Sequence, residues 1–269
     1  MALSSIDPHL LALATALGLF ALLWPISVAR RDASVVDAAW GPGFAIIAWL
    51  IWALAGQPAD ERSLILLGLI SLWAARLAVY MIGRKLREPE EDPRYGKLRA
   101  SWDPGFWWKS LFVVFLLQGT LQWLLVMPAQ RALLNSTEAF GAVSALGVAL
   151  AVAGLAFETI ADAQLDRFRR QNPRPALCTS GLWAWSRHPN YLGEMAFWWG
   201  VWLIAVPSAE LWTIVAPILL TLLLRYVSGV PMLERHLAET RPEFDAYRSR
   251  TPMLAPWPLA RKKERAAAR

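Results

Sequence analysis

The sequence predicts an all-α integral membrane protein, a bundle of seven transmembrane helices with its N-terminus outside and its C-terminus in the cytosol. The chain of 269 residues is 56% hydrophobic and only 18% charged, whereas soluble domains carry about a quarter charged residues. It contains 16 tryptophans, whose indole rings favour the membrane interface. Its apolar residues gather in runs of roughly 20, the length that crosses a bilayer. This composition excludes disorder, collagen and a coiled coil.

Seven apolar runs predict the spans of a single membrane domain, residues 1–269. They lie near 9–29, 35–55, 64–83, 111–130, 140–161, 191–207 and 211–229. The first run is not a cleaved signal, because no basic segment precedes it and Arg30 and Arg31 follow it. Only Ser208, Ala209 and Glu210 separate the last two runs, which predicts a tight helical hairpin. The polar residues gather in two loops, 84–110 and 162–190, and in a tail, 230–269.

The basic residues predict the orientation. All of the 27 Lys and Arg residues except Arg62, Arg76 and Arg131 fall in the loops and tail that face inward if the N-terminus is outside. This asymmetry is the one that the positive-inside rule describes. This asymmetry accounts for the net charge of +6 without any nucleic acid. The basic residues of 261–269 are expected to face anionic lipid headgroups.

Polar side chains at membrane depth are costly and mark candidate functional residues. Asp37 begins the second span, where it either interacts with the helix dipole, pairs with Arg30 or Arg31, or belongs to a site. Arg76 lies in the middle of the third span and needs a partner, for which Asp37 and Glu158 are candidates.

Two further segments carry dense polar groups. Glu158, Asp162 and Asp166 share one helix face, being four residues apart. The run Ser186–Glu194 opens the sixth span, and Asn190 and Glu194 stack on one face, where an amide and a carboxylate suit a ribose or a nicotinamide. Arg187 and His188 stand at a helix N-terminus, which favours phosphate, and Gly193 permits a close approach to the backbone.

The residues 234–253 predict an amphipathic helix broken at Pro242, ending in Tyr247, Arg248 and Arg250. Arginine and aromatic side chains there are suited either to a dinucleotide or to lipid. The chain lacks a G-x-G-x-x-G run, a P-loop and a serine nucleophile elbow. Three histidines and one cysteine, Cys178, form no close ligand set, so we expect no metal and no disulfide.

Four runs resemble the bacterial relatives of membrane steroid 5-alpha-reductases (3-oxo-5-alpha-steroid 4-dehydrogenase-like enzymes). They are D-A-A-W-G at 37–41, E-D-P-R-Y at 91–95, R-H-P-N-Y-L-G-E at 187–194 and Y-R-S-R-T-P-M at 247–253. The third run is also shared with isoprenylcysteine carboxyl methyltransferases and phospholipid methyltransferases. The first two favour the reductases.

This resemblance implies a multi-pass protein of the bacterial inner (cytoplasmic) membrane with NADPH bound on the cytosolic side. The enzyme would reduce the 4,5 double bond of a 3-oxo-4-ene steroid or a similar lipid enone. Asp37 matches the position that binds the ketone. The expected cofactor-binding residues are Arg84, Arg87, Asp162, Arg169, Arg187, His188, Asn190, Tyr191, Glu194, His236, Tyr247 and Arg250. The expected partners are the apolar substrate and membrane lipids, with the protein a monomer.

One position departs from the family. Trp73 stands where the eukaryotic enzymes carry a proton-donating tyrosine, and an indole donates a hydrogen bond but supplies no proton. Either Tyr95 or Tyr80 is the donor, or Asp37 takes that part, or the substrate differs; we favour Tyr95. Arg84 replaces the asparagine expected in the same region.

Two other functions remain open. An S-adenosylmethionine-dependent membrane methyltransferase shares the R-H-P-N-Y-L-G-E run, but the glutamate pair typical of those enzymes is broken here as Glu234-Arg235-His236. The third possible function is a non-enzymatic lipid or sterol binder. The density of charged residues predicted at the cytosolic mouth of the bundle argues against it, because an apolar ligand needs few charges.

Overall fold

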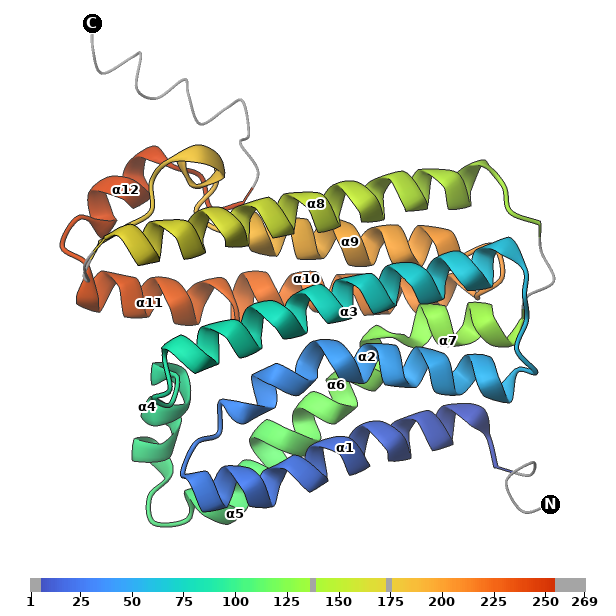
Figure 1. Cartoon of the computed structure of the whole chain (residues 1–269), viewed down its shortest axis with the longest axis horizontal. Coiled ribbons are helices and arrows are strands. Elements are labelled where there is room, and N and C mark those ends of the chain that lie inside the picture. Colours follow the sequence, from blue (N-terminus) through green and yellow to red (C-terminus); the bar gives the residue numbers. More distant parts are fainter. Residues whose placement is uncertain (1–5, 136–138, 173–175, 255–269) are drawn as a thin grey trace, which may run out of the picture. The chain divides into compact units, whose positions relative to one another are not determined.

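A computed structural model describes residues 6–135, 139–172 and 176–254, and in these ranges every regular element is helical (Figure 1). The elements are α1 (Pro8–Arg30), α2 (Val35–Leu54), α3 (Glu61–Arg87), α4 (Pro93–Trp102), α5 (Phe106–Ser110), η2 (Leu111–Leu116), α6 (Leu117–Leu125), α7 (Met127–Leu134), α8 (Ala142–Gln171), η3 (Gly181–Ala184), α9 (Pro189–Ala205), η4 (Leu211–Ile214), α10 (Val215–Leu222), η5 (Leu223–Val227), α11 (Val230–Thr240) and α12 (Phe244–Arg250). The all-α prediction is confirmed. The basic residues of 261–269, which were predicted to face anionic lipid headgroups, lie outside the described ranges.

Within the described residues, six rather than seven helical segments are long and apolar enough to cross a membrane. They are Pro8–Arg30, Val35–Leu54, Glu61–Arg87, Phe106–Leu125, Ala142–Gln171 and Leu211–Thr240. The predicted sixth span corresponds to α9, which has 17 residues. At 1.5 Å per residue it is about 26 Å long, shorter than the roughly 30 Å hydrocarbon core. The protein is thus a multi-pass membrane protein; a seventh crossing and the orientation stay predictions.

Two predicted loops are largely helical. The segment 84–110 contains the end of α3 and all of α4 and α5, and the segment 162–190 begins with the last ten residues of α8. The predicted span 140–161 follows the apolar run, but good helix formers such as Gln164, Leu165 and Arg167 continue the helix into polar surroundings. The shared helix face of Asp162 and Asp166 indicates this continuation. The predicted break at Pro242 is confirmed, since α11 ends at Thr240 and α12 begins at Phe244.

The contacts of the chain gather into two compact units. Unit 1 comprises the described residues of Met1–Val148 and Val201–Pro217, and unit 2 those of Ala149–Gly200 and Ile218–Arg269. The prediction of a single membrane domain is not tested by this division and stays a prediction.

Unit 1 is built on α1, α2, α3 and α6, of which α2 packs on both α1 and α3 (Figure 1). One buried cluster draws side chains from α1, α2, α4, α5 and η2 and contains Phe20, Val36, Tyr95, Phe106 and Phe115. Trp73 of α3 is fully buried elsewhere in the unit and packs edge to face on Phe44 of α2, with ring centroids 5.4 Å apart. The apolar packing therefore fixes the start of α2 next to α4.

Unit 2 contains a close crossing of α8 and α9. A Cβ added to Gly193 would lie 2.6 Å from the backbone nitrogen of Glu158, and one added to Gly154 would lie 2.4 Å from that of Phe197. No other residue fits these positions without a shift of the backbone. The close approach expected at Gly193 is thus confirmed, and the group that approaches it is α8.

Candidate functional site

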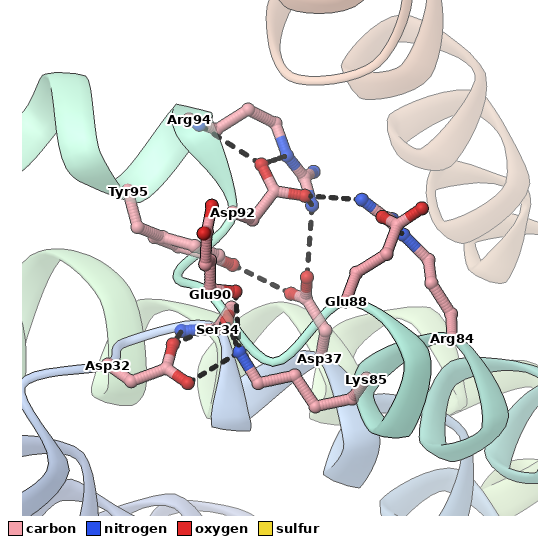
Figure 2. A network of polar contacts seen from close by, with 10 residues as sticks. All are labelled: Asp32, Ser34, Asp37, Arg84, Lys85, Glu88, Glu90, Asp92, Arg94 and Tyr95. Atoms are coloured by element: carbon pink, nitrogen blue, oxygen red, sulfur yellow. Dashed lines mark hydrogen bonds and ion pairs between the residues drawn. The ribbon is translucent and has the colours of Figure 1, made fainter. Parts of the chain in front are cut away.

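The carboxylate of Asp37 in the first turn of α2 is held by two residues of α4 (Figure 2). The Tyr95 hydroxyl donates to Oδ1 of Asp37 over 2.7 Å, and Nη2 of Arg94 donates to Oδ2 over 2.9 Å. The Asp37 side chain is 16% exposed. Asp37 forms its ion pair with Arg94. The partners that the sequence suggested were Arg30, Arg31 and Arg76.

Asp92 joins this pair to α3. Its carboxylate caps the N-terminus of α4 by accepting from the backbone N–H of Arg94, and Pro93 stands in the first turn, where its missing N–H costs nothing. Asp92 also accepts from Nε of Arg94 and from Nη2 of Arg84, each over 3.0 Å. A continuous series of charged contacts therefore runs from Arg84 through Asp92 and Arg94 to Asp37.

The two residues of α4 and their cap carry shifted pKa values. Burial acts to raise the pKa of Asp92, but the hydrogen bonds and charge of Arg94, with Arg84, outweigh it and lower the pKa to about 2. Burial opposes the charge on Arg94, yet Asp37 and Asp92 outweigh it and raise the pKa of the guanidinium. Burial and then the charge of Asp37 raise the pKa of Tyr95 well above its ordinary value. Tyr95 is thus a neutral phenol at neutral pH.

A second set of contacts fixes the turn between α1 and α2 (Figure 2). Nζ of Lys85 lies 2.6 Å from Oδ2 of Asp32 and donates to the Ser34 hydroxyl and the Glu90 carbonyl, over 3.0 and 2.8 Å. Glu91 accepts from the backbone N–H of Ala33 over 2.8 Å. These contacts tie the start of α2, and with it Asp37, to the segment that precedes α4.

Arg187 and His188 of unit 2 both bind Glu234 of α11. Nε of Arg187 donates to Oε1 of Glu234 over 2.7 Å, and Nε2 of His188 lies 2.9 Å from the same oxygen. Nη1 of Arg187 also donates to the carbonyls of Arg248 and Thr251. Arg187 is only 8% exposed. It therefore holds the C-terminal segment of the described chain against the start of α9.

Neighbouring side chains complete this cluster. The Tyr247 hydroxyl donates to the Trp183 carbonyl over 2.5 Å, and burial raises its pKa. The His188 ring stacks on Tyr191, with centroids 5.5 Å apart. Nδ2 of Asn190 donates to Oδ1 of Asp162 over 3.3 Å, so that α8 and α9 place an amide beside a buried carboxylate.

The remaining predicted residues are exposed or half-buried. Arg87 is exposed near the end of α3, and Arg169 is exposed near the end of α8. Arg250 is exposed and its Nε donates to the Ala246 carbonyl of its own helix. Glu194 and His236 are half-buried, on α9 and α11. Asp37, Tyr95 and Arg84 thus meet in unit 1, while Asp162, Arg187, His188, Asn190, Tyr191 and Tyr247 gather in unit 2.

Sequence reasoning missed three residues: Asp92, Arg94 and Glu234. The run E-D-P-R-Y carried a usable signal for the first two, because Asp followed by Pro is the pattern of a helix N-cap and Arg94 stands next to Tyr95. Glu234 lies 46 residues from His188 along the chain, and no local pattern predicts that contact. Within the described ranges, no three His, Cys, Asp or Glu residues gather into a set that would hold a metal ion.

Comparisons with known proteins identify the family. No solved structure matches the chain significantly. The chain is 30% identical over 240 residues to an uncharacterized protein of Schizosaccharomyces pombe, an alignment that covers 78% of this chain and 69% of the relative. The model of the family described as protein of unknown function (DUF1295) matches residues 23–251, and the chain therefore belongs to the DUF1295 family.

Proposed function

We propose that this protein is an NADPH-dependent reductase of activated carbon–carbon double bonds, with a 3-oxo-4-ene steroid or a similar lipid enone as its substrate. The observation that carries the proposal is the largely buried hydrogen bond of 2.7 Å between the Tyr95 hydroxyl and the Asp37 carboxylate. It places a neutral proton donor beside a carboxylate and a guanidinium, at the start of a candidate membrane span.

This arrangement suits the chemistry at the ketone end of an enone. When a hydride adds to the β carbon, negative charge develops on the ketone oxygen, and a positioned acid lowers that barrier. A ketone oxygen beside Tyr95 competes with Asp37 for the phenolic hydrogen. Nε2 of Gln118 donates to the Tyr95 oxygen over 3.3 Å and stabilises it after the proton has moved. Arg94 meanwhile balances the charge of Asp37.

The donor set of unit 2 fits a dinucleotide. NADPH would supply the hydride. Asn190 and Asp162 offer an amide and a carboxylate side by side, which suit the hydroxyls of a ribose, and Nδ1 of His188 is buried without a hydrogen-bond partner among the described residues. Arg169 and Arg250 present exposed guanidiniums suited to phosphate. Arg187 and Tyr247, which bind backbone carbonyls, are proposed to hold the segment around Thr251 in place for the cofactor.

The proposal includes seven crossings of a bacterial inner membrane with the N-terminus outside. The distribution of Lys and Arg supports this orientation, because the basic connections then lie in the cytosol, where NADPH is available.

The test is the thermal stability of the detergent-purified protein with NADPH, NADH or S-adenosylmethionine, followed by turnover of a testosterone-like enone. A ligand that binds only the folded state raises the midpoint as it saturates the site. We expect an upward shift with NADPH, lost in Glu194→Ala, and enone-dependent oxidation of NADPH. A shift with S-adenosylmethionine and none with either nicotinamide nucleotide contradicts the proposal and favours a methyltransferase.

A further inference from the structure

The connection between α4 and η2 forms an aromatic groove in unit 1. It has a volume of about 430 Å³ and is lined by Trp102, Trp108, Lys109, Phe112 and Val113. Trp108 and Phe112 are 48% and 56% exposed. The groove lies at the start of the candidate span Phe106–Leu125, the level at which aromatic and basic side chains meet lipid headgroups.

The ammonium group of Lys109 is the polar centre of this groove. Its Nζ lies 5.9 Å from the ring centroids of both Trp102 and Trp108. Its hydrogen bond to the Trp102 carbonyl is long, at 3.4 Å. Among the described residues, Lys109 takes part in none of the ion pairs found. A cation held between two indole rings without an acidic partner is suited to an anion.

The indole N–H of Trp108 is a second hydrogen-bond donor close to the Lys109 ammonium group. A Cβ added to Gly105 would lie 3.1 Å from Nζ of Lys109 and 3.2 Å from Nε1 of Trp108. Because residue 105 has no side chain, the ammonium of Lys109 and the indole N–H of Trp108 both lie where that side chain would otherwise be. One ligand oxygen atom, or two on one phosphate, can therefore accept from both groups.

The groove is held in place by its neighbours. Nε1 of Trp24 on α1 donates to the Trp107 carbonyl over 2.9 Å, which fixes α5. The guanidinium of Arg99 lies 4.5 Å from the centroid of the Phe106 ring. These two contacts hold the backbone of α5, which carries Trp108 and Lys109, in place before a ligand enters, which favours binding.

We propose that this groove binds an anionic glycerophospholipid, with the phosphate on Lys109 and Trp108 and an acyl chain along Phe112 and Val113. The charge selects the headgroup, since a zwitterionic lipid brings a cation that Lys109 repels. The apolar lining and the position at the end of a span select a lipid over a free anion. This site is independent of the proposed reductase activity.

Native mass spectrometry of the full detergent-purified protein, titrated with phosphatidylglycerol or phosphatidylcholine, tests the proposal. We expect phosphatidylglycerol to bind at least about fivefold more tightly, as one lysine at a headgroup contributes. Lys109→Gln is expected to remove this preference. Lys97→Gln, which removes an exposed lysine of α4 outside the groove, is the matched control and is expected to retain it.

Gly105→Ala provides a second variant that leaves the charge unchanged. Its Cβ would lie 2.9 Å from Cε of Lys109, so the flexible lysine moves off the site while the fold is retained, and phosphatidylglycerol binding is expected to fall. This variant decides the question if Lys109→Gln fails to fold. Equal binding of the two lipids to the wild type, unchanged binding in Gly105→Ala, or displacement of the lipid by millimolar inorganic phosphate overturns the proposal.

Discussion

The Tyr95 hydroxyl and the Asp37 carboxylate are joined by a hydrogen bond of 2.7 Å that links α4 to the first turn of α2. Fifty-eight residues separate the two along the chain. Two independent sets of contacts keep them together: the apolar cluster around the Tyr95 ring, and the ion pairs of Asp92 and Arg94. A contact supported in this way suits a catalytic pair, which has to keep its geometry through turnover.

Tyr95→Phe removes the proposed proton donor and keeps the ring in its cluster. We expect turnover of an enone to fall about 100-fold, the lower range for general acid catalysis, while the thermal shift with NADPH is unchanged. Tyr80→Phe, which alters a tyrosine of α3 outside the hydrogen bond to Asp37, is the control and is expected to keep most of the activity. The reverse result would assign the donor to Tyr80.

Asp37→Asn is expected to keep the response to NADPH and to lose most of the turnover, because an amide cannot balance Arg94 or orient the phenol in the same way. Full activity in this variant removes Asp37 from the mechanism.

The ion pair between Asp37 and Arg94 also makes a prediction about stability. Arg94→Gln leaves the partly buried Asp37 without its cation and leaves Asp92 paired with Arg84 alone. Removing one partner of a buried pair costs about 3 kcal/mol. In the double variant Asp37→Asn/Arg94→Gln the charge left without a cation is gone too, so we expect the thermal midpoint to recover in part. Additive losses in this double-mutant cycle would show that the two side chains do not interact.

Asp92 predicts a pH dependence. Its pKa in the folded protein is about 2, below the ordinary aspartate pKa of 3.8, so its contribution of about 2 kcal/mol is complete above about pH 4 and is lost as the pH falls toward 2. The difference in thermal midpoint between the wild type and Asp92→Asn is therefore expected to be constant from pH 7 to 5 and to shrink below pH 4. Asp103→Asn, at an exposed carboxylate of the same region, serves as the control. A difference that grows in acid would refute the assignment.

The crossing of α8 and α9 makes a prediction of its own. Gly154→Ala and Gly193→Ala each place a methyl group against a backbone that cannot give way, and we expect both to lower the thermal midpoint. Gly18 and Gly68 also lie in helices, but a Cβ at either meets nothing within 4 Å. Replacing them by alanine is therefore expected to be neutral or to stabilise by about 0.5–1 kcal/mol. If all four alanine variants changed the thermal midpoint to a similar extent, α8 and α9 would not cross closely at the two glycines.

The sequence predicts the helical class and most of the spans, because a run of about 20 apolar residues has few other structures available. It predicts helix ends poorly. The apolar part of α8 stops near Ala161, but the helix runs on to Gln171 because its polar residues also favour a helix. The sequence predicts seven crossings, whereas six segments of the described chain are long and apolar enough. The difference is α9, which is apolar but has only 17 residues.

The candidate site was predictable only in part. The sequence marks Asp37 as a candidate because an acid at membrane depth is unusual, whereas its partner Arg94 lies in a polar segment where an arginine is ordinary. Arg187 was predicted to bind phosphate from its place before a helix, but its bonds to Glu234 and to two carbonyls depend on a segment more than 45 residues away. Such contacts follow from the packing of the chain and leave no local pattern.

The length of α8 has a mechanical consequence. Its 30 residues amount to about 45 Å, roughly 15 Å more than a hydrocarbon core, and Gly154, Glu158, Asp162 and Asp166 follow one another at intervals of four along it. Because Gly154 packs against the backbone of α9, it fixes the rotation of α8 about its own axis. It thereby also determines the direction in which each later carboxylate of this helix points. One alanine inserted between Leu155 and Ala161 would turn Asp162 by about 100° away from Asn190, although neither residue had been altered. The close packing at Gly154 thus determines the orientation of polar side chains about two helical turns further along α8.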